Sequence, residues 1–285
     1  PAGRIANAAS LLCDGRIQQT IQKVLLPTYD VFDEQRYFRP AETVTPMKLD
    51  DKLLGVHICE DAWWGAPDTV YDDPAARQFD PVSALVAEGV DLLINLSASP
   101  FEIDKPDRRL ALFRRHVDRH TTPVAFVNQV GGNDDLVFDG HSFLLGADGS
   151  PVATLPGFQP SVEIVDTESR GIEAGEHDRL READLLDALT LGLGDYMRKC
   201  EFTDCILGLS GGIDSAVAAC VAARAVGPSH VHALLMPSRF SSDHSVEDAL
   251  NLAKRLQINH EIVGIEDIHA AYGEADTVGN ELKSE

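Results

Sequence analysis

Two short segments carry residue types whose spacing could do chemistry. In the first, Cys59 follows the apolar run 53–58 and is followed at once by Glu60 and Asp61. A thiol at the end of a buried strand would stand on a rigid support, but it needs a nearby cation and proton acceptor, because an unassisted thiol has a pKa of about 8.5. Lys23 is the candidate cation. Taken singly, a cysteine is more often a buried apolar filler and a lysine is usually solvated.

The second segment is Ser210-Gly211-Gly212-Ile213-Asp214-Ser215, between an expected strand at 205–209 and an expected helix at 214–225. Paired glycines and a helix N-terminus together turn backbone N–H groups and partial positive charge toward an anion, and the two serine hydroxyls can donate to phosphate. Asp214 would repel phosphate unless Mg²⁺ intervened, which favours a metal-bound nucleotide. The spacing is neither Walker A nor Gly-x-Gly-x-x-Gly. A plain turn in which Asp214 caps the helix is the simpler alternative.

The elements around Cys59 are predicted as short strands alternating with helices, which indicates a layered α/β or α+β domain. Strands are expected at 6–13, 16–24, 53–58, 92–96, 124–130, 142–145 and 151–155, and helices at 81–88 and 107–119. Asp14-Gly15 predicts a tight hairpin turn. The helix 107–119 has an apolar face, and we interpret its arginines, with His116 and His120, as a solvated basic face rather than a metal or nucleic-acid site.

The second half has a different pattern. Between 166 and 179 apolar periodicity disappears, as in a solvated connector, so the predicted domains are 1–165 and 181–285 with a linker at 166–180. A helix at 182–199 is followed by strand, helix, strand, helix and strand at 205–209, 214–225, 231–236, 245–256 and 261–265, with Ser245 as a helix cap. This βαβαβ order predicts a parallel sheet with right-handed crossovers.

Composition limits the classes of partner. The 285 residues are enough for about two domains, and 24 Lys and Arg against 46 Asp and Glu give a net charge of −22. That charge opposes loose binding to nucleic acid or anionic lipid, and no apolar run is long enough for a membrane span. Five cysteines without a dense framework favour a reducing cytoplasm. A first residue other than Met and a polar last stretch favour a fragment of a longer protein.

Several motifs in the first half resemble the nitrilase, or carbon–nitrogen hydrolase, superfamily. They are Lys23 with Leu26-Pro27-x-Tyr29 and Phe32-x-Glu34, then Ile58-Cys59-Glu60-Asp61, then Asn95-Leu96-Ser97-Ala98-Ser99-Pro100. The stretch from Val127 to Gly140 is similar to the superfamily's glutamine-amidase branch. The resemblance implies part of a four-layer αββα sandwich.

The same resemblance implies roles for individual residues. Cys59 would attack the glutamine carboxamide, Lys23 would stabilise the oxyanion, and Glu34 matches a supporting carboxylate. Positions that would recognise the ends of glutamine are Tyr29, Glu60 and Ser99. The superfamily's general-base Glu lies well upstream of its Lys, and only 22 residues precede Lys23 here. We therefore expect this chain to lack the base and to turn over little amide by itself.

The segment 210–215 resembles the PP-loop of the ATP pyrophosphatase superfamily, and with the following run 235–242 it looks like the NAD synthetase branch. This implies a partial doubly wound parallel-sheet domain of the adenine nucleotide α-hydrolase type. ATP would be bound by the loop, by Met236 and by Arg239, and Mg²⁺ by Asp214. For Arg239 a solvated loop arginine is the alternative.

An amidase followed in one chain by this PP-loop is similar to the glutamine-dependent NAD synthetases. That resemblance implies a ligase that releases ammonia from glutamine and uses it, with Mg·ATP, to amidate deamido-NAD, in a cytoplasmic homo-oligomer acting on small molecules. Two alternatives are a stand-alone carbon–nitrogen hydrolase and a noncatalytic nucleotide-binding module.

Overall fold

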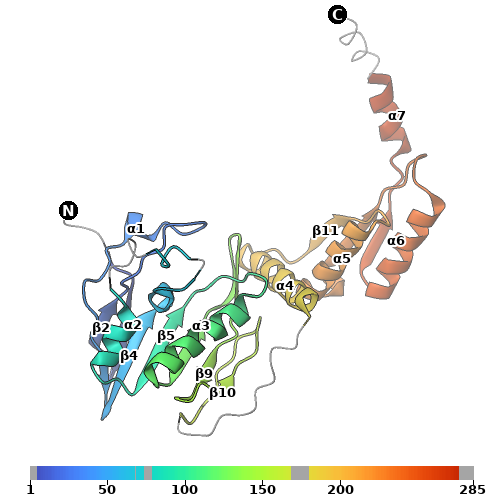
Figure 1. Cartoon of the computed structure of the whole chain (residues 1–285). Coiled ribbons are helices and arrows are strands. Elements are labelled where there is room, and N and C mark those ends of the chain that lie inside the picture. The colour runs from blue at the N-terminus through green and yellow to red at the C-terminus, as the bar shows by residue number, and fades with distance from the viewer. Residues whose placement is uncertain (1–4, 68, 74–78, 168–179, 276–285) are drawn as a thin grey trace, which may run out of the picture. The chain divides into compact units, whose positions relative to one another are not determined.

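A computed structural model describes residues 5–67, 69–73, 79–167 and 180–275 (Figure 1). The chain divides into two compact units, Pro1–Gly131 with Leu136–Asp184 and Gly132–Asp135 with Leu185–Glu285. Most of the expected linker lies outside the described residues, so the domain limits drawn from the sequence stay a prediction. Among the described residues, no helix combines the length and the apolar character that a membrane crossing needs.

The first half of the chain alternates strands and helices as expected. In chain order its elements are β1 (Ala8–Cys13), β2 (Arg16–Gln22), α1 (Glu34–Tyr37), β3 (Met47–Leu49), β4 (Lys52–Ile58), the 3-10 helix η1 (Cys59–Trp63), α2 (Pro81–Ala87), β5 (Leu92–Ser97), α3 (Lys105–His120), β6 (Val124–Asn128), β7 (Val130–Asn133), β8 (Leu136–Asp139), β9 (Phe143–Leu145) and β10 (Pro151–Thr154). Six of the strands form one sheet in the order β10-β9-β6-β5-β4-β3, in which β4, β5 and β6 are parallel.

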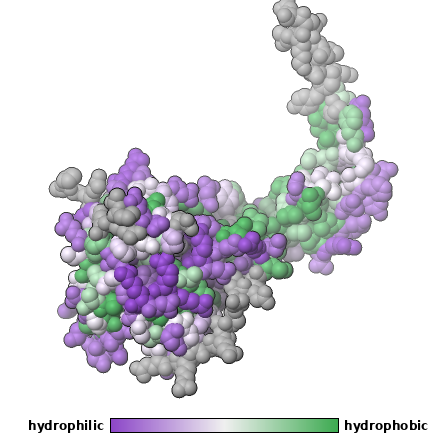
Figure 2. Space-filling view, in the orientation of Figure 1, coloured by the Kyte–Doolittle hydropathy of each residue, from purple (hydrophilic) through white to green (hydrophobic). Residues whose placement is uncertain are grey.

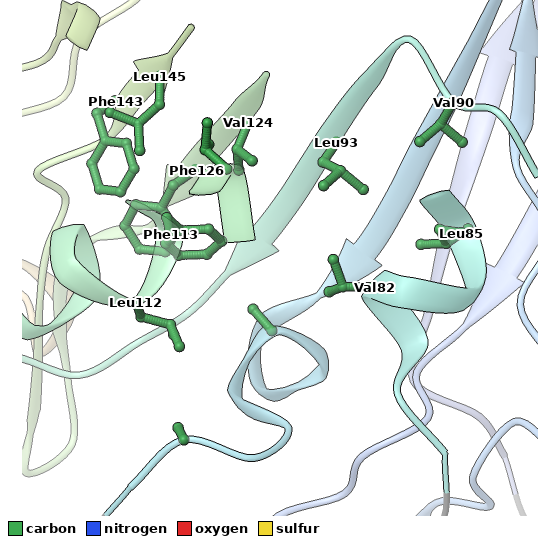
Figure 3. Packing of buried hydrophobic residues seen from close by; sticks show 13 residues of the cluster. Val82, Leu85, Val90, Leu93, Leu112, Phe113, Val124, Phe126, Phe143 and Leu145 are labelled. Atoms are coloured by element: carbon green, nitrogen blue, oxygen red, sulfur yellow. The ribbon is translucent and has the colours of Figure 1, made fainter. Parts of the chain in front are cut away.

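Helices α2 and α3 cover one face of this sheet (Figures 1 and 3). Leu85 of α2 and Phe113 of α3 are fully buried against Leu93, Val124 and other sheet residues. Each such side chain contributes about 1.5–3 kcal/mol through removal of its apolar surface from water. The resulting core fixes the carboxyl ends of β4 and β5, which is where the predicted thiol lies.

The hairpin β1–β2 packs on the opposite face. Its turn residues Asp14 and Gly15 both have positive φ, at 50° and 71°, as the sequence predicted for a tight Asp-Gly turn. Ile21 of β2 joins Val56 and Ile58 of β4 in a separate apolar cluster. The layers follow one another in the order helices α2 and α3, six-stranded sheet and β1–β2 hairpin. This order agrees with part of an αββα sandwich and confirms the α/β class.

The interpretation of α3 as a helix with a solvated basic face was wrong for two residues. Arg109 is only 1% exposed and His116 is also buried. The buried positions of α3 are Arg109, Leu112, Phe113, His116 and Val117. These positions follow the helical spacing of a core-facing stripe, so both polar residues lie on the face that packs inward.

The second unit contains the predicted parallel sheet. The remaining elements are α4 (Arg181–Lys199), β11 (Cys205–Gly208), α5 (Ile213–Val226), the 3-10 helix η2 (Pro228–His230), β12 (Val231–Leu235), α6 (Asp243–Leu256), β13 (Asn259–Ile262) and α7 (Glu266–Ala275). Strands β11, β12 and β13 are adjacent and parallel, which confirms the βαβαβ prediction. The cap of α6 is Ser242 rather than Ser245, because the Ser242 hydroxyl accepts from the Ser245 N–H.

Hydrophobic side chains are also exposed on this unit, and Figure 2 shows apolar surface over α4 and α5. The exposed residues include Leu189, Ile206, Ile213 and Val217. Contiguous apolar surface of this kind is typical of contact surfaces.

Candidate functional site

Cys59 lies where β4 ends and η1 begins. Its φ is +47°, a left-handed conformation that residues with a side chain seldom adopt and that costs about 1–2 kcal/mol. Asn95 of β5 donates from Nδ2 to the Cys59 carbonyl oxygen at 3.2 Å, and the Ser97 hydroxyl donates to Asn95 Oδ1 at 2.6 Å. The end of β5 therefore supports the sharp turn that places the thiol.

Lys23 follows the last residue of β2, and its side chain is almost wholly buried. Its Nζ atom lies 2.7 Å from Oε1 of Glu34, the first residue of the short helix α1. The backbone N–H of Glu34 donates to the Pro27 carbonyl at 3.0 Å, which ties α1 to the segment after Lys23. The structure thus brings together the Lys23 ammonium and the Glu34 carboxylate, which the sequence analysis named separately as members of the site.

The thiol titrates under the influence of these same charges. Burial raises the pKa of Cys59, and the Lys23 ammonium opposes that rise. The carboxylates of Glu60 and Glu34 raise the thiol pKa further, whereas the Ser97 hydroxyl lowers it. Cys59, Lys23 and Glu34 therefore form one electrostatic cluster. Its net bias toward the neutral thiol means that a proton acceptor has to assist nucleophilic attack.

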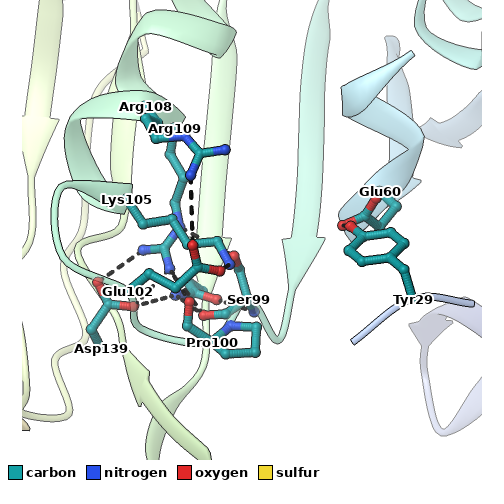
Figure 4. Close-up of polar contacts among 10 residues, drawn as sticks. Tyr29, Glu60, Ser99, Pro100, Glu102, Lys105, Arg108, Arg109 and Asp139 are labelled. Carbon is teal, nitrogen blue, oxygen red and sulfur yellow. Dashed lines mark hydrogen bonds and ion pairs between the residues drawn. The ribbon is translucent and has the colours of Figure 1, made fainter. Parts of the chain in front are cut away.

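A second group of residues surrounds the carboxylate next to the nucleophile. The Tyr29 hydroxyl donates to Glu60 Oε1 at 2.7 Å (Figure 4). Burial raises the pKa of Glu60, while its interactions with Tyr29, Lys23 and Tyr71 lower it. The sequence singled out Tyr29 and Glu60, but it gave no signal for Tyr71, which approaches from 42 residues farther along the chain than Tyr29.

Lys105 and Glu102 were also missed. Lys105 Nζ lies 2.5 Å from Glu102 Oε1 at the beginning of α3. The charge of Lys105 lowers the pKa of Glu60, and that of Glu102 raises the pKa of Tyr29. Both side chains therefore lie within electrostatic reach of the Tyr29–Glu60 pair. A polar site with charges of both signs suits a zwitterionic ligand.

Ser99 belongs to a neighbouring buried network around Arg109 (Figure 4). The Arg109 guanidinium donates to Asp139 Oδ1 and Oδ2 at 2.9 and 2.8 Å, and its Nε donates to Ser99 Oγ at 3.2 Å. It also donates to the carbonyls of Ser99 and Pro100, each at 3.0 Å. Asn128 Oδ1 accepts from the Ser99 N–H at 2.9 Å. The position of Arg109 on the inward stripe of α3 was the available sequence signal for this network.

The glycine loop joins β11 to α5 in the second unit. Gly211 has φ +80°, and a Cβ atom there would collide with the backbone of Ser245. The Ser215 hydroxyl accepts from the Ser210 N–H at 3.2 Å and donates to the Gly212 carbonyl at 3.0 Å. The loop is therefore folded tightly over the start of α5. Asp214, in the first turn of α5, is exposed, and so is Ile213.

A cavity of about 200 Å³ opens beside this loop. It is lined by Gly208, Leu209, Ser210, Leu234, Leu235, Met236, Pro237, Ser241, Ser245 and Val246. The mainly apolar wall with a serine-rich edge suits a planar base next to a phosphate chain. Of the two residues that the sequence proposed for ATP binding in this region, Met236 lines the cavity and Arg239 does not. The Arg239 guanidinium instead lies 2.5 Å from Glu266 Oε1.

A metal ion at this site would take most of its coordinating oxygens from a bound nucleotide and from water. Among the described residues there is no group of three or more His, Cys, Asp or Glu side chains placed to hold a metal ion. Asp214 alone fits a Mg²⁺ ion whose other ligands are phosphate oxygens and water, which is how Mg²⁺ is usually bound with nucleotides.

Comparison with known proteins agrees with both halves. The carbon-nitrogen hydrolase family model matches residues 75–174, and the NAD synthase model matches residues 185–284. A glutamine-dependent NAD(+) synthetase from Synechocystis sp. is 42% identical over 277 residues, which cover 95% of this chain and 49% of that protein. One from Rhodobacter capsulatus is 40% identical over 276 residues, covering 93% and 47%.

Solved structures give the same result. The glutamine-dependent NAD+ synthetase from Acinetobacter baumannii in complex with ADP matches with a TM-score of 0.83 and 30% identity, over 96% of this chain and 50% of that one. The synthetase from Cytophaga hutchinsonii has the same fold, with a TM-score of 0.75 at 20% identity over 98% and 53%. The chain spans about half the length of the curated relatives it matches. The chain thus carries a segment similar to the carbon-nitrogen hydrolase family followed by a segment similar to the NAD synthase family, and over nearly its whole length it is similar to glutamine-dependent NAD(+) synthetases.

Proposed function

We propose that this chain supplies the glutamine-hydrolysing site and the ATP-binding loop of an enzyme that converts deamido-NAD to NAD. The observation that carries the proposal is the coexistence, in one polypeptide, of the Cys59–Lys23–Glu34 cluster and the loop at Gly211. One site would release ammonia from glutamine. The other would adenylate the nicotinate carboxylate of deamido-NAD, and ammonia would then displace AMP.

In the amidase reaction, Cys59 Sγ would attack the carboxamide carbon of glutamine. The Lys23 ammonium would stabilise the negative charge that develops on the carbonyl oxygen, because it is buried and therefore weakly screened by water. Collapse of this adduct would expel ammonia and leave a glutamyl thioester. Water would then hydrolyse the thioester to glutamate and regenerate the thiol. Glu34 would hold Lys23 in place through the 2.7 Å ion pair.

Glutamine would be recognised by residues near the thiol. The hydrogen-bonded pair Tyr29–Glu60 supports this role, because it presents a hydroxyl and a carboxylate next to the nucleophile. Glu60 would attract the substrate's α-ammonium group. Ser99, which Arg109 holds in place through two hydrogen bonds, would also take part in recognising glutamine.

In the second unit, the backbone N–H groups of the segment 210–215 would bind phosphates of ATP. The cavity beside Met236 supports placement of the adenosine there. Mg²⁺, held by Asp214 together with the phosphates, would neutralise charge at the leaving pyrophosphate. Arg239 would reach the nucleotide only after release from Glu266.

The cellular setting belongs to the same proposal. Free ammonia is mostly protonated near pH 7, so protection of the released ammonia from water would preserve the nucleophile. The enzyme would act on small molecules in the cytoplasm, and its charge of −22 disfavours nucleic acid as a partner. The exposed apolar residues on α4, β11 and α5 support a homo-oligomer, which light scattering of the purified enzyme would test.

A Cys59→Ala variant of the whole enzyme tests the division of labour. NAD formation with glutamine should be lost while NAD formation with added ammonium salt is kept, because only the source of ammonia is removed. Cys13→Ala, at another partly buried cysteine in β1, is the matched control and should keep both activities. Equal loss with both donors in Cys59→Ala would contradict the proposal.

An Asp214→Ala variant tests the nucleotide half. Pyrophosphate release and NAD formation should fall with either nitrogen donor, because Asp214 would no longer help to hold Mg·ATP. Asp243→Ala, which also lies in the first turn of a helix, α6, is the control. Normal ammonia-driven rates in Asp214→Ala would refute the metal role. ATP binding without pyrophosphate release in the unmodified enzyme would instead favour a noncatalytic nucleotide-binding module.

A further inference from the structure

Asp61 is a buried carboxylate that the mechanism above does not use. It is 1% exposed and lies two residues after Cys59 in η1. Its Oδ1 atom accepts hydrogen bonds from the backbone N–H groups of Val24 and Leu25, at 3.0 and 2.8 Å. Its Oδ2 atom accepts from the N–H of Ile58 at 3.0 Å. One side chain therefore binds two segments that lie more than 30 residues apart in sequence.

These donors are direct neighbours of the two residues that would carry the chemistry. Val24 follows Lys23, and Ile58 precedes Cys59. Lys23 follows β2, whereas Cys59 follows β4, and these strands belong to different sheets. The contact between the two strands is apolar, through Ile21, Val56 and Ile58. Apolar packing is non-directional, so it sets the spacing of the strands far less sharply than hydrogen bonds do.

A carboxylate is the side chain that suits this position. Both of its oxygens accept and neither donates, so it satisfies three backbone N–H groups without a conflict. An Asn side chain would turn its NH₂ group toward at least one of these donors and leave a buried N–H without a partner, which costs about 1–3 kcal/mol. The choice of Asp over Asn thus matches a requirement for acceptors on both sides.

We propose that Asp61 is the positioning residue that sets the distance between the Lys23 ammonium and the Cys59 thiol. It does so by joining the backbone after Lys23 to the backbone before Cys59 through its two oxygens. The inference deepens the proposed amidase function and rests on it for its relevance to catalysis. The geometric claim itself concerns only the coupling of Lys23 to Cys59.

The experiment measures that coupling in the whole enzyme through the reaction of Cys59 with iodoacetamide as a function of pH. Peptide mapping identifies the alkylated cysteine. An opposite charge close to a titrating group typically shifts its pKa by 1–3 units. Lys23→Met should therefore slow alkylation at pH 7.5 by about tenfold in the otherwise unmodified enzyme. In an Asp61→Asn background the same Lys23→Met change should have less than about a twofold effect, because the ammonium is no longer held beside the thiol.

The matched control is Asp91→Asn. Asp91 Oδ2 accepts from the N–H of Leu53 at 2.7 Å, at the opposite end of β4. This variant removes a similar carboxylate-to-backbone contact from the same strand and should leave the tenfold effect of Lys23→Met intact. An undiminished effect of Lys23→Met in the Asp61→Asn background would overturn the inference.

A second variant guards against failure of Asp61→Asn to fold. Asp61→Glu keeps the charge and both acceptors but lengthens the arm by one methylene, so the effect of Lys23→Met should again shrink. If that effect equals the one in the unmodified enzyme, Asp61 only caps η1 and the inference is wrong. Iodoacetamide needs no turnover of glutamine, so the loss of coupling can be seen even if the enzyme proves unable to hydrolyse glutamine. Failure to hydrolyse glutamine would refute the proposed function and would leave the inference about Asp61 standing.

Discussion

The Lys23 ammonium lies 2.7 Å from the Glu34 carboxylate, and Lys23 is almost completely buried. A buried ammonium loses its hydration, so a close carboxylate is needed to keep the charge in the folded protein. The two partners act on the Cys59 thiol in opposite directions, since Lys23 lowers its pKa and Glu34 raises it. The ion pair therefore sets both the stability of this region and the reactivity of the thiol.

Replacement of Glu34 by Gln should separate these two effects. The free energy of unfolding should fall by about 3 kcal/mol, because the buried Lys23 charge loses its counter-charge. The pKa of the Cys59 thiol should fall at the same time, because a negative charge has been removed from its surroundings. Denaturant unfolding and the pH dependence of iodoacetamide alkylation measure the two quantities. The exposed Glu88→Gln, at the end of α2, serves as the control and should change neither. A raised thiol pKa in Glu34→Gln would contradict the electrostatic account.

Arg109→Leu should be strongly destabilising. It would leave the fully buried Asp139 carboxylate without a counter-charge and would remove the hydrogen bonds that Arg109 donates to the Ser99 and Pro100 carbonyls, at a cost of about 3–5 kcal/mol. Arg108→Leu removes the neighbouring arginine of the same helix, whose ion pair with Glu102 is half-exposed and worth less than about 1 kcal/mol. Urea unfolding of the two variants provides the comparison. Similar losses for both would show that the buried network contributes little.

His57 should make the first unit sensitive to mild acid. Burial lowers the pKa of this histidine to about 4, against a donor–acceptor contact with the Gly55 carbonyl that raises it. Between pH 6.5 and pH 4 the unfolded chain takes up a proton that the folded chain refuses, so acid favours unfolding. The contribution should be complete above pH 6.5 and fall by about 2 kcal/mol between pH 7 and pH 5.

The measurement compares the free energy of unfolding at pH 7 and pH 5 for the unmodified protein and for His57→Gln. The variant has no titrating side chain at this position. Between pH 7 and pH 5 its free energy of unfolding should therefore fall by about 2 kcal/mol less than that of the unmodified protein. Burial also lowers the pKa of His116, and it raises that of Asp61 to about 6. These groups are present in both proteins, so most of their contribution cancels in the comparison, apart from the charge interaction between His116 and His57. Equal pH dependence in the two would rule out His57 as a source of acid sensitivity.

Gly211 and Gly212 should respond differently to alanine. At Gly211 the φ of +80° and the collision of a Cβ with the Ser245 carbonyl oxygen require the loop to move. Gly211→Ala should therefore lower the melting temperature and abolish the ATP binding proposed for this loop. At Gly212 the φ is −84° and a Cβ would meet only the Ser210 hydroxyl at 3.4 Å. Gly212→Ala should therefore leave the melting temperature nearly unchanged. Calorimetry and nucleotide titration test the pair, and equal melting temperatures would show that the loop can relax away from Ser245.

Much of the architecture is encoded locally and could be predicted. The Asp14-Gly15 turn depends on the backbone conformations that these two residue types allow, and the βαβαβ order depends on apolar periodicities within single elements. The glycine loop at Gly211 was recognisable because its neighbours in sequence are also its neighbours in space. Motif resemblance likewise pointed to Cys59, Lys23 and Glu34 as a group.

The contacts between distant segments were decided only in three dimensions. The pairing of Arg109 with Asp139, the approach of Tyr71 to Glu60, and the hydrogen bonds from Val24 and Ile58 to Asp61 each join segments that meet because strands and helices pack. A sequence states which side chains are charged, but not which charge becomes buried beside which donor. That outcome depends on the desolvation of polar groups within a packed core, and it exists only after the core has formed.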